Sequence, residues 1–199
     1  MAAPDRSAKV SLIEEDRIFT LLDIGAYGLL ALEYDRCTFD HLDLKNADLS
    51  KKTFVECVFR DCDLSLVQLE CTSFRVVRFE RCKLLGARFD SCHTFLIAFT
   101  FDQCILDLAT FHGLRLKGTK FDRCRMRETD LSSADFTNGS FAGSDLGAAV
   151  FDGTVLEGAD FRGALNYSID PSTNRIRKAR FSKDGVAGLL DRTGIIIED

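Results

Sequence analysis

Eight cysteines are the residues of this chain best suited to metal binding or redox chemistry. Seven of them lie, or are expected to lie, two positions before a large apolar residue: Cys37, Cys57, Cys62, Cys82, Cys92, Cys104 and Cys124. One hypothesis is a metal ladder or redox wire, and the other is a set of small apolar side chains that fill a core. No CxxC pair or matching histidine spacing is present, which favours the second hypothesis. We therefore predict free thiols in a reducing compartment, with no metal and no cofactor.

The histidines and carboxylates form no catalytic motif. His41 and His112 lie just outside core positions, His93 lies in an irregular stretch, and none has a nucleophile motif around it. Asp43 and Asp63, twenty residues apart, resemble an acid/base pair, but solvated surface acids are far more common. The sequence therefore predicts a binding protein rather than an enzyme.

A run of acidic residues is the clearest candidate for a binding surface. It contains no Lys or Arg, although both are frequent on either side. Its seven members are Glu128, Asp130, Asp135, Asp145, Asp152, Glu157 and Asp160. They either keep the protein soluble, with Asp at a habitual repeat position, or form a negative strip for a basic, DNA-binding groove of a partner.

These residues are positioned by a repeat in which a large apolar residue returns every fifth position from Leu29 to Ala164. Steps of five would scatter apolar residues around a helix and alternate them between the faces of a strand. The pattern fits a chain that turns a corner every five residues and points each large residue into a common interior. Phe121, Phe141 and Phe161 show a second period of twenty, so four fives complete one circuit. We predict an all-β, four-sided solenoid.

The twenty-residue period also locates a fault. Phe79 and Phe101 are twenty-two residues apart, so two residues are inserted, and the change of phase places them within Asp90–Phe95. We expect a bulge or small loop at one corner there.

The two ends are expected to differ from the solenoid, which gives three regions: 1–24, 25–164 and 165–199. Phe19 keeps the five-residue phase, so the first coil either begins there or is covered by a helical cap over Ser11–Leu22. After Pro171 we expect no further coil, then a short helix that stops at Gly194, and a strand. The apolar residues of this end either cap the last coil or form a dimer interface: Val186, Leu189, Leu190, Ile195, Ile196 and Ile197.

Charge and hydropathy limit the function classes. The net charge is −5, which argues against a nucleic-acid binder that works by neutralising phosphates. No signal peptide is evident, and the uncharged runs are too short to span a bilayer. We predict a soluble cytoplasmic protein that binds neither membranes nor nucleic acid directly.

Several segments resemble the repeat units of pentapeptide repeat proteins: ADLSK at Ala47, ADFTN at Ala134, SDLGA at Ser144 and ADFRG at Ala159. This resemblance implies a right-handed quadrilateral β-helix with a C-terminal helix and strand that dimerise. The length, the acidic shaft and the C-terminal module are similar to the topoisomerase-poison resistance group, which includes Qnr, MfpA, McbG and AlbG. The similarity to the albicidin-resistance protein AlbG is carried by DLSLVQLECTSFRVVRFERCKLLG and LNYSIDPSTNRIRKARFS.

The resemblance implies a DNA-mimicking protein that binds DNA gyrase, with topoisomerase IV as a further candidate partner. Its role would be to protect the enzyme from a poison, as antibiotic resistance or self-immunity. Qnr proteins project long loops that this chain lacks, so a different poison is possible. The alternative is a structural or scaffolding repeat protein without a topoisomerase partner.

Overall fold

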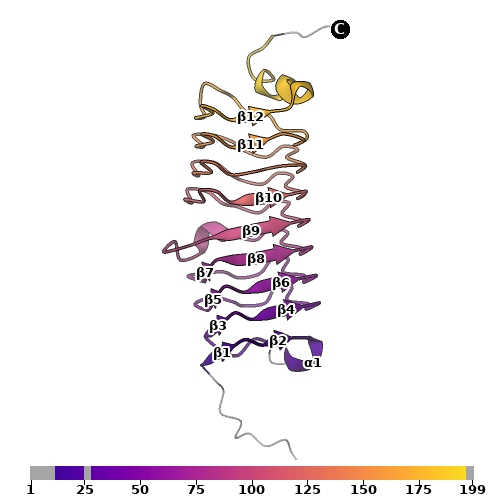
Figure 1. Cartoon of the computed structure of the whole chain (residues 1–199), viewed down its shortest axis with the longest axis vertical. Helices are drawn as coiled ribbons and strands as arrows, with labels where there is room; N and C mark the ends of the chain where they lie inside the picture. The colour runs from indigo at the N-terminus through magenta and orange to yellow at the C-terminus, as the bar shows by residue number, and fades with distance from the viewer. Residues whose placement is uncertain (1–11, 25–27, 196–199) are drawn as a thin grey trace, which may run out of the picture.

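The protein is a straight shaft of stacked coils (Figure 1). The computed structural model describes residues 12–24 and 28–195. Each coil runs around four sides, and short strands lie along two of them. The strands are β1 (Ile13–Glu15), β2 (Ile18–Phe19), β3 (Glu33–Asp35), β4 (Thr38–Asp40), β5 (Thr53–Val55), β6 (Val58–Arg60), β7 (Ser73–Arg75), β8 (Val77–Glu80), β9 (Phe99–Asp102), β10 (Lys120–Asp122), β11 (Asp160–Phe161) and β12 (Arg180–Phe181). The helices are α1 (Leu21–Ile24), η2 (Phe89–Ser91) and η3 (Lys183–Leu189).

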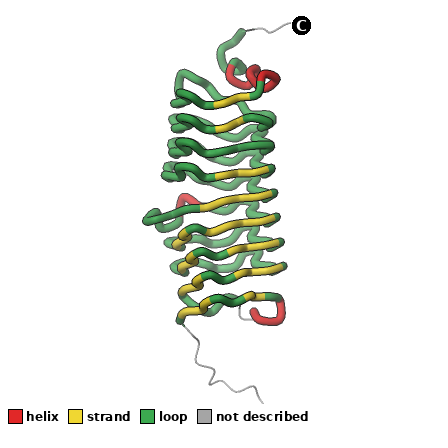
Figure 2. The backbone as a smooth tube through the Cα atoms, viewed as in Figure 1, coloured by secondary structure: helices red, strands yellow, loops and turns green. Residues whose placement is uncertain are grey.

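A corner every five residues produces the four-sided path, as predicted. Arg36, His41, Asn46, Lys51 and Glu56 all have φ between 50° and 60°, so the chain turns through the left-handed region at each of them. The backbone N–H groups at these corners donate to the next coil, as Asn46 does to the Ser65 carbonyl at 2.9 Å. Loops and turns therefore make up most of each coil (Figure 2).

All strand pairing in the described chain is parallel, and it follows the twenty-residue register except between β8 and β9, where the offset is twenty-two. Strands β1, β3, β5 and β7 form one sheet, and β2, β4, β6, β8, β9 and β10 form the sheet on the adjoining side. Tyr34 pairs with Phe54, for example, and Phe101 with Phe121. The predicted all-β quadrilateral solenoid is confirmed.

Columns of aromatic rings fill the shaft. The rings of Phe101 and Phe121 lie 5.1 Å apart and 3° from parallel, and Phe141 continues the stack at 5.2 Å. Phe121 also contacts Phe111 and Phe136 edge-to-face. Such stacking is possible because identical residues recur at the spacing of neighbouring strands.

The register fault lies later in the chain than the sequence indicated. Ser73 pairs with His93 at an offset of twenty, whereas Val77 pairs with Phe99 at an offset of twenty-two. The two extra residues therefore belong to residues 94–98, which overlap the predicted Asp90–Phe95 only at residues 94 and 95. Leu96, which the five-residue count placed in the core, is 63% exposed, because the inserted loop carries it outward.

The N-terminal end is a coil rather than a helical cap. Residues from Ile13 to Phe19 form β1 and β2, and Phe19 stacks on Phe39 at 5.2 Å. The prediction that Phe19 keeps the repeat phase is therefore confirmed, and the predicted cap helix over Ser11–Leu22 is wrong. The helix present, α1, has only four residues.

The C-terminal boundary predicted at Ala164 is also wrong. β11 pairs with β12, and Phe161 stacks on Phe181 at 5.2 Å, so the repeat continues past Pro171. Helix η3 then crosses over Tyr167. A Cβ at Gly188 would clash with the Tyr167 carbonyl oxygen, so only glycine fits there, and a Cβ at Gly185 would displace the Tyr167 hydroxyl. No helix in the described part of the chain is long and apolar enough to cross a membrane.

Candidate partner-binding surfaces

The seven acids of the predicted strip do not lie on one side of the shaft. Their run spans more than one twenty-residue coil, so it winds around the rod. Asp130, Asp135, Asp145 and Asp160 directly precede core residues on four different sides. The predicted strip is therefore a spiral, because residues close in sequence turn a corner every five positions.

Four of these acids form ion pairs with basic residues of the shaft. Asp135 lies 3.4 Å from Lys117, Asp145 2.7 Å from Arg127, and the remaining two pair at 2.6 Å: Glu157 with Arg175 and Asp160 with Arg162. Asp160 also accepts a hydrogen bond from the Arg162 backbone at 3.0 Å, which fixes the corner. The hydrogen bond from the Arg162 side chain lowers the pKa of Asp160. Because these four acids stabilise the repeat itself, they favour the interpretation that the acidic run serves solubility and structure.

The other three lie together on one side, where the folded coils bring further acids beside them. Glu128, Asp130 and Asp152 make no ion pair within residues 12–24 and 28–195. We call this surface, on the side of Leu49, Phe89 and Phe151, the acidic face. Its members are Asp48, Glu70, Asp90, Glu128, Asp130 and Asp152.

The acidic face carries charge on five of six successive coils. At a coil spacing of about 4.8 Å, the core residues from Leu49 to Phe151 span roughly 24 Å. Arg88 lies on this face and is paired with Asp90 at 2.9 Å, and Lys51 and Lys52 lie close enough to Asp48 to interact with its charge. The signal for this face was present in the sequence as the twenty-residue column, not as the contiguous acidic run.

An apolar edge borders the acidic face. Leu66 and Leu108 occupy the same corner on two coils, with exposed fractions of 53% and 55%. Gly86 occupies this corner on the coil between them. A Cβ added at Gly86 would lie only 3.0 Å from the Leu66 side chain. Leu85, at 36% exposure, adjoins them. An edge of exposed leucines beside unpaired carboxylates has the composition of a protein-binding surface.

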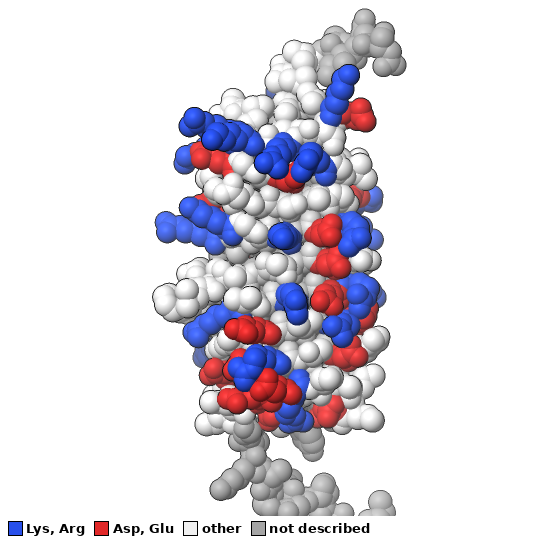
Figure 3. All heavy atoms as spheres, in the orientation of Figure 1, with Lys and Arg blue, Asp and Glu red and all other residues white. Residues whose placement is uncertain are grey.

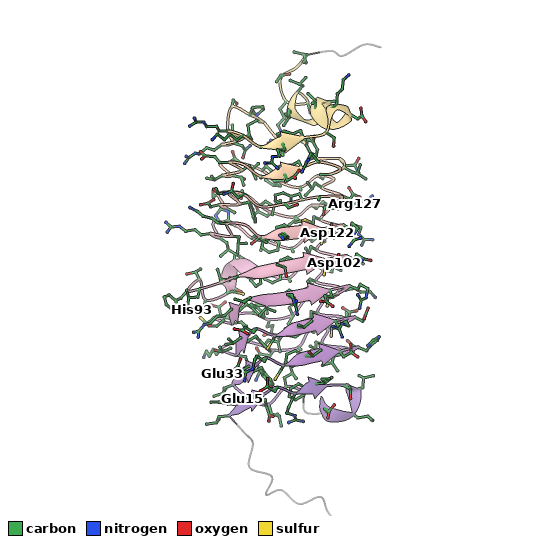
Figure 4. The ribbon with its side chains drawn as sticks, viewed as in Figure 1. Glu15, Glu33, His93, Asp102, Asp122 and Arg127 are labelled. Atoms are coloured by element: carbon green, nitrogen blue, oxygen red, sulfur yellow. The ribbon has the colours of Figure 1, made fainter. Side chains whose placement is uncertain are left out.

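The loop of residues 94–98 is the second apolar feature. Phe95 and Leu96 are 61% and 63% exposed, and Val76 on the coil below is 63% exposed. The loop begins next to His93 and projects from the shaft (Figure 4). A shallow cavity of about 410 Å³ separates its far side, Ile97 and Ala98, from Arg115 and Lys117. Because a free protein gains nothing by exposing a phenylalanine at a tip, this loop is a candidate anchor for a partner.

The corner beside β9 and β10 carries acidic and basic side chains that neutralise one another. Asp102 and Asp122 lie on successive coils (Figure 4), and Arg123 contacts both, at 2.8 and 3.2 Å. Arg81 binds Asp61 in the same way at 2.7 Å. This corner therefore presents little net charge to a partner.

The seven cysteines predicted to lie at core positions are all buried. Cys71 is exposed, and all eight thiols are free. The thiols of Cys62 and Cys82 each donate to the carbonyl of the preceding coil at 3.3 Å. Ser144 and Thr129, in equivalent positions, do the same at 3.0 and 2.9 Å. A hydroxyl can replace the thiol, and buried alanines such as Ala87 and Ala134 occupy equivalent positions, so the position selects a small side chain.

One group of side chains has the composition of a metal site. Among the described residues, Asp40, His41 and Asp61 offer ligand atoms within 4.8 Å of one another. However, Arg81 donates to both carboxylate oxygens of Asp61, at 2.8 and 2.7 Å, and so opposes a cation there. Asp43 and Asp63 stack as expected, but each accepts a turn N–H, from Lys45 and Ser65.

The predicted dimer residues separate into two groups. Leu189 packs against the core and so caps the last coil, and Leu190 is partly buried. Val186 and Ile195 are 41% and 55% exposed. Ile196 and Ile197 lie outside the described residues. The predicted strand therefore stays a prediction. The predicted helix is present as η3, a 3-10 helix that ends at Leu189 rather than at Gly194.

Comparisons with known proteins agree with this architecture. The family model of pentapeptide repeats matches residues 37–75 and 129–165, with eight copies. The chain is 33% identical over 110 residues to the pentapeptide repeat protein MfpA of Mycobacterium tuberculosis strain H37Rv. That match covers 55% of this chain and 51% of MfpA, so the chain spans about half the length of this curated relative.

A solved structure shows the same fold over almost the whole chain. A trypsin-treated variant of QnrB1, described as a plasmid-mediated fluoroquinolone resistance protein, superposes with a TM-score of 0.61. It covers 94% of this chain and 98% of QnrB1, at 16% sequence identity. The chain is therefore similar in sequence to pentapeptide repeats over residues 37–75 and 129–165, and it shares the fold of QnrB1 over almost its whole length.

Proposed function

We propose that this protein binds DNA gyrase through the acidic face and protects that enzyme from a topoisomerase poison. The observation that carries the proposal is the geometry of the face: carboxylates on five of six coils of a straight rod, all but Asp90 without an ion pair in the described chain, beside exposed leucines. MfpA, to which the chain is similar over 110 residues, is named as a pentapeptide repeat protein. QnrB1, which shares the fold, is described as a fluoroquinolone resistance protein.

The charge of the face suits a groove that evolved to bind DNA. A line of carboxylates on a rigid rod presents negative charge without the cost of ordering a flexible chain. Complementary charge accelerates the encounter and fixes its register, and the effect weakens as salt screens it. Glu128, Asp130 and Asp152 are available for this role because no Arg or Lys side chain of the described chain neutralises them.

Apolar anchors complete the binding surface. Charge on a rim adds mainly to the association rate, whereas buried apolar side chains supply most of the affinity of protein interfaces. Leu66 and Leu108 lie directly beside the acidic face, and Phe95 and Leu96 project from the adjoining side. We propose that gyrase covers at least one of these two apolar features.

The test compares two fourfold variants that remove the same charge. The first, Asp48→Asn, Glu70→Gln, Asp130→Asn and Asp152→Asn, neutralises the acidic face. Amides keep the turn hydrogen bonds that Asp48 and Asp130 accept at 2.9 Å. We expect this variant to inhibit gyrase supercoiling less and to protect it less against both a fluoroquinolone and albicidin.

The matched control neutralises the acids that are already ion-paired: Asp135→Asn, Asp145→Asn, Glu157→Gln and Asp160→Asn. We expect it to retain activity, because these acids lie on other sides and bind their own arginines or lysine. Equal loss in both variants would mean that only total charge matters. Full activity in both, or no effect of the wild type on gyrase, would favour a scaffolding protein without a topoisomerase partner.

The loop is tested separately with Phe95→Ser and Leu96→Ser in one variant. Its control, Leu22→Ser with Leu165→Ser, also removes two exposed apolar side chains, 95% and 57% exposed. If the loop anchors the partner, only the first variant loses protection. If the loop variant protects gyrase as well as wild type does, the anchor is assigned to the Leu66–Leu108 edge.

A second copy of the chain is a further proposed partner. Val186 and Ile195 expose apolar surface at the C-terminal end of the shaft, where a two-fold axis would place two rods end to end. Deleting Gly194–Asp199 should shift the mass measured by light scattering from dimer towards monomer. A stable dimer after this deletion would place the interface elsewhere.

A further inference from the structure

The C-terminal half of the shaft carries a surface of opposite sign to the acidic face. Figure 3 shows Lys and Arg side chains gathered over β11 and β12 and beside β10. We call this surface the basic patch. Its basic members, all exposed, are Arg115, Lys117, Lys120, Arg175, Arg177, Lys178 and Arg180.

The acids within the basic patch are already neutralised. Asp135 pairs with Lys117 at 3.4 Å and Glu157 with Arg175 at 2.6 Å. Asp160 pairs at 2.6 Å with Arg162, which lies just beyond the patch. The bases left without an ion pair in the described chain are Arg115, Lys120, Arg177, Lys178 and Arg180. The patch is therefore a concentrated positive surface on a chain of net charge −5.

The bases form two rows that run around the shaft. Arg115 pairs in register with Asp135, Asp135 with Val155, and Val155 with Arg175. The rows are thus three coils apart, roughly 14 Å at the strand spacing of about 4.8 Å. Between them lie small polar residues, Thr137, Asn138 and Ser140, and a shallow cavity of about 280 Å³ that Arg177 and Lys178 also line. The row separation is close to the ~12 Å width of a DNA major groove.

We propose that the basic patch binds the phosphate backbone of duplex DNA, with one row against each strand of a groove. Arginine forks match phosphate oxygens, and short hydroxyl and amide side chains donate to the same oxygens. An acidic protein would be the alternative occupant. None of the exposed large apolar side chains of the described chain lies between the rows, so the patch lacks the anchors of a protein interface.

This proposal revises the expectation drawn from composition, because net charge averages over opposite sides of the rod. A phosphate responds to charges within about a Debye length, ~8 Å at physiological salt, so the local surplus decides binding. The patch is independent of the gyrase contact and would act on DNA alone or on DNA beside the acidic face's partner.

The test measures fluorescence anisotropy of a labelled 20-base-pair duplex at 50 and 200 mM salt, using the full chain. Wild type should bind at 50 mM salt with a micromolar Kd and weaken steeply at 200 mM. The variant Arg115→Gln, Lys120→Gln, Arg177→Gln and Lys178→Gln should bind at least tenfold more weakly. Its log–log salt slope should fall by about three to four, since each phosphate contact contributes ~0.9.

The matched control, Lys45→Gln, Lys51→Gln, Arg78→Gln and Lys83→Gln, removes the same charge from exposed positions of the N-terminal half. It should bind like wild type. Equal weakening of both variants, or no binding by wild type at 50 mM salt, would overturn the proposal. Poly-glutamate that displaces the duplex as effectively as unlabelled DNA of equal charge would assign the patch to an acidic protein instead. Gyrase assays do not enter this result, so it can fail while the proposed function holds.

Discussion

The two halves of the shaft reach the same coil by different local chemistry. Before the loop of residues 94–98, the corners from Arg36 to Arg81 use non-glycine residues with positive φ, and strands lie on two sides. After it, glycines take over many corners, including Gly113, Gly143 and Gly158, and strand pairing remains on one side. Five buried cysteines belong to the first half and two to the second. The path of the chain is thus set by the core residues, while corners and small inward positions vary.

The core shared by both halves predicts the largest effect. Phe121→Ala should lower the free energy of unfolding by about 3–5 kcal/mol, because Phe121 contacts rings on both neighbouring coils. Phe181→Ala should cost less, since Phe181 is only partly buried and stacks on Phe161 alone of the Phe column. Urea denaturation measures both. Equal losses would show that neighbouring coils do not share their cores as the columns indicate.

The fold could be read from the sequence because its information is periodic. The Phe column repeats the same position seven times, and this repetition was enough to predict the architecture. It also placed Phe19 in the first coil. The end at Ala164 was wrong because Pro171 suggested a stop, yet its coil bulges around the proline and returns to phase at Ile176 and Phe181. The fault was misplaced because Leu96 has a core-like residue type while lying on an exposed loop.

The candidate site could be predicted less well, for a geometric reason. Acids near each other in sequence are separated by corners, so Asp130 and Asp145 lie on different sides. Acids twenty residues apart are neighbours, as Glu70 and Asp90 are, and Asp152 lies two residues after Val150, the register partner of Asp130. Ion pairs across coils, such as Arg127 with Asp145, then decide which acids remain available, and they require the folded register.

The buried thiols, most of which lie in the first half, predict that the stability of the protein falls at high pH. Burial raises the pKa of Cys57 to about 12 from 9.0, and a hydrogen bond that the Cys82 thiol donates to Cys104, together with burial, raises that of Cys82 to about 12. Between pH 9 and 12 the unfolded thiols ionise while the folded ones keep their protons. Stability is therefore complete below pH 9 and falls as pH rises through this window, by up to about 1.36 kcal/mol per pH unit for each thiol.

This dependence is measured by urea denaturation at pH 8 to 11. Cys57→Ala should flatten the decline, even if it is less stable throughout, whereas Cys71→Ala should leave the slope unchanged because Cys71 is exposed. Native thiol titration at pH 8 should find Cys71 reacting first. An identical slope in the two variants would show that burial of Cys57 does not govern its ionisation.

The corners themselves predict the smallest effect, and the chain offers a matched pair. Val76, with φ of 58°, and Gly118, with φ of 74°, occupy the equivalent corner in the two halves. A β-branched residue in the left-handed region costs about 1–2 kcal/mol. Glycine removes this cost, but its greater flexibility in the unfolded chain offsets part of the gain in stability. Val76→Gly should therefore stabilise the protein by up to about 1 kcal/mol. Gly118→Val should destabilise it by a similar amount, because a Cβ there meets nothing within 4 Å and only the backbone angle is penalised. If both substitutions destabilise, then Val76 must be held by contacts with the loop of residues 94–98, and the first half tolerates its corners through packing rather than through backbone strain.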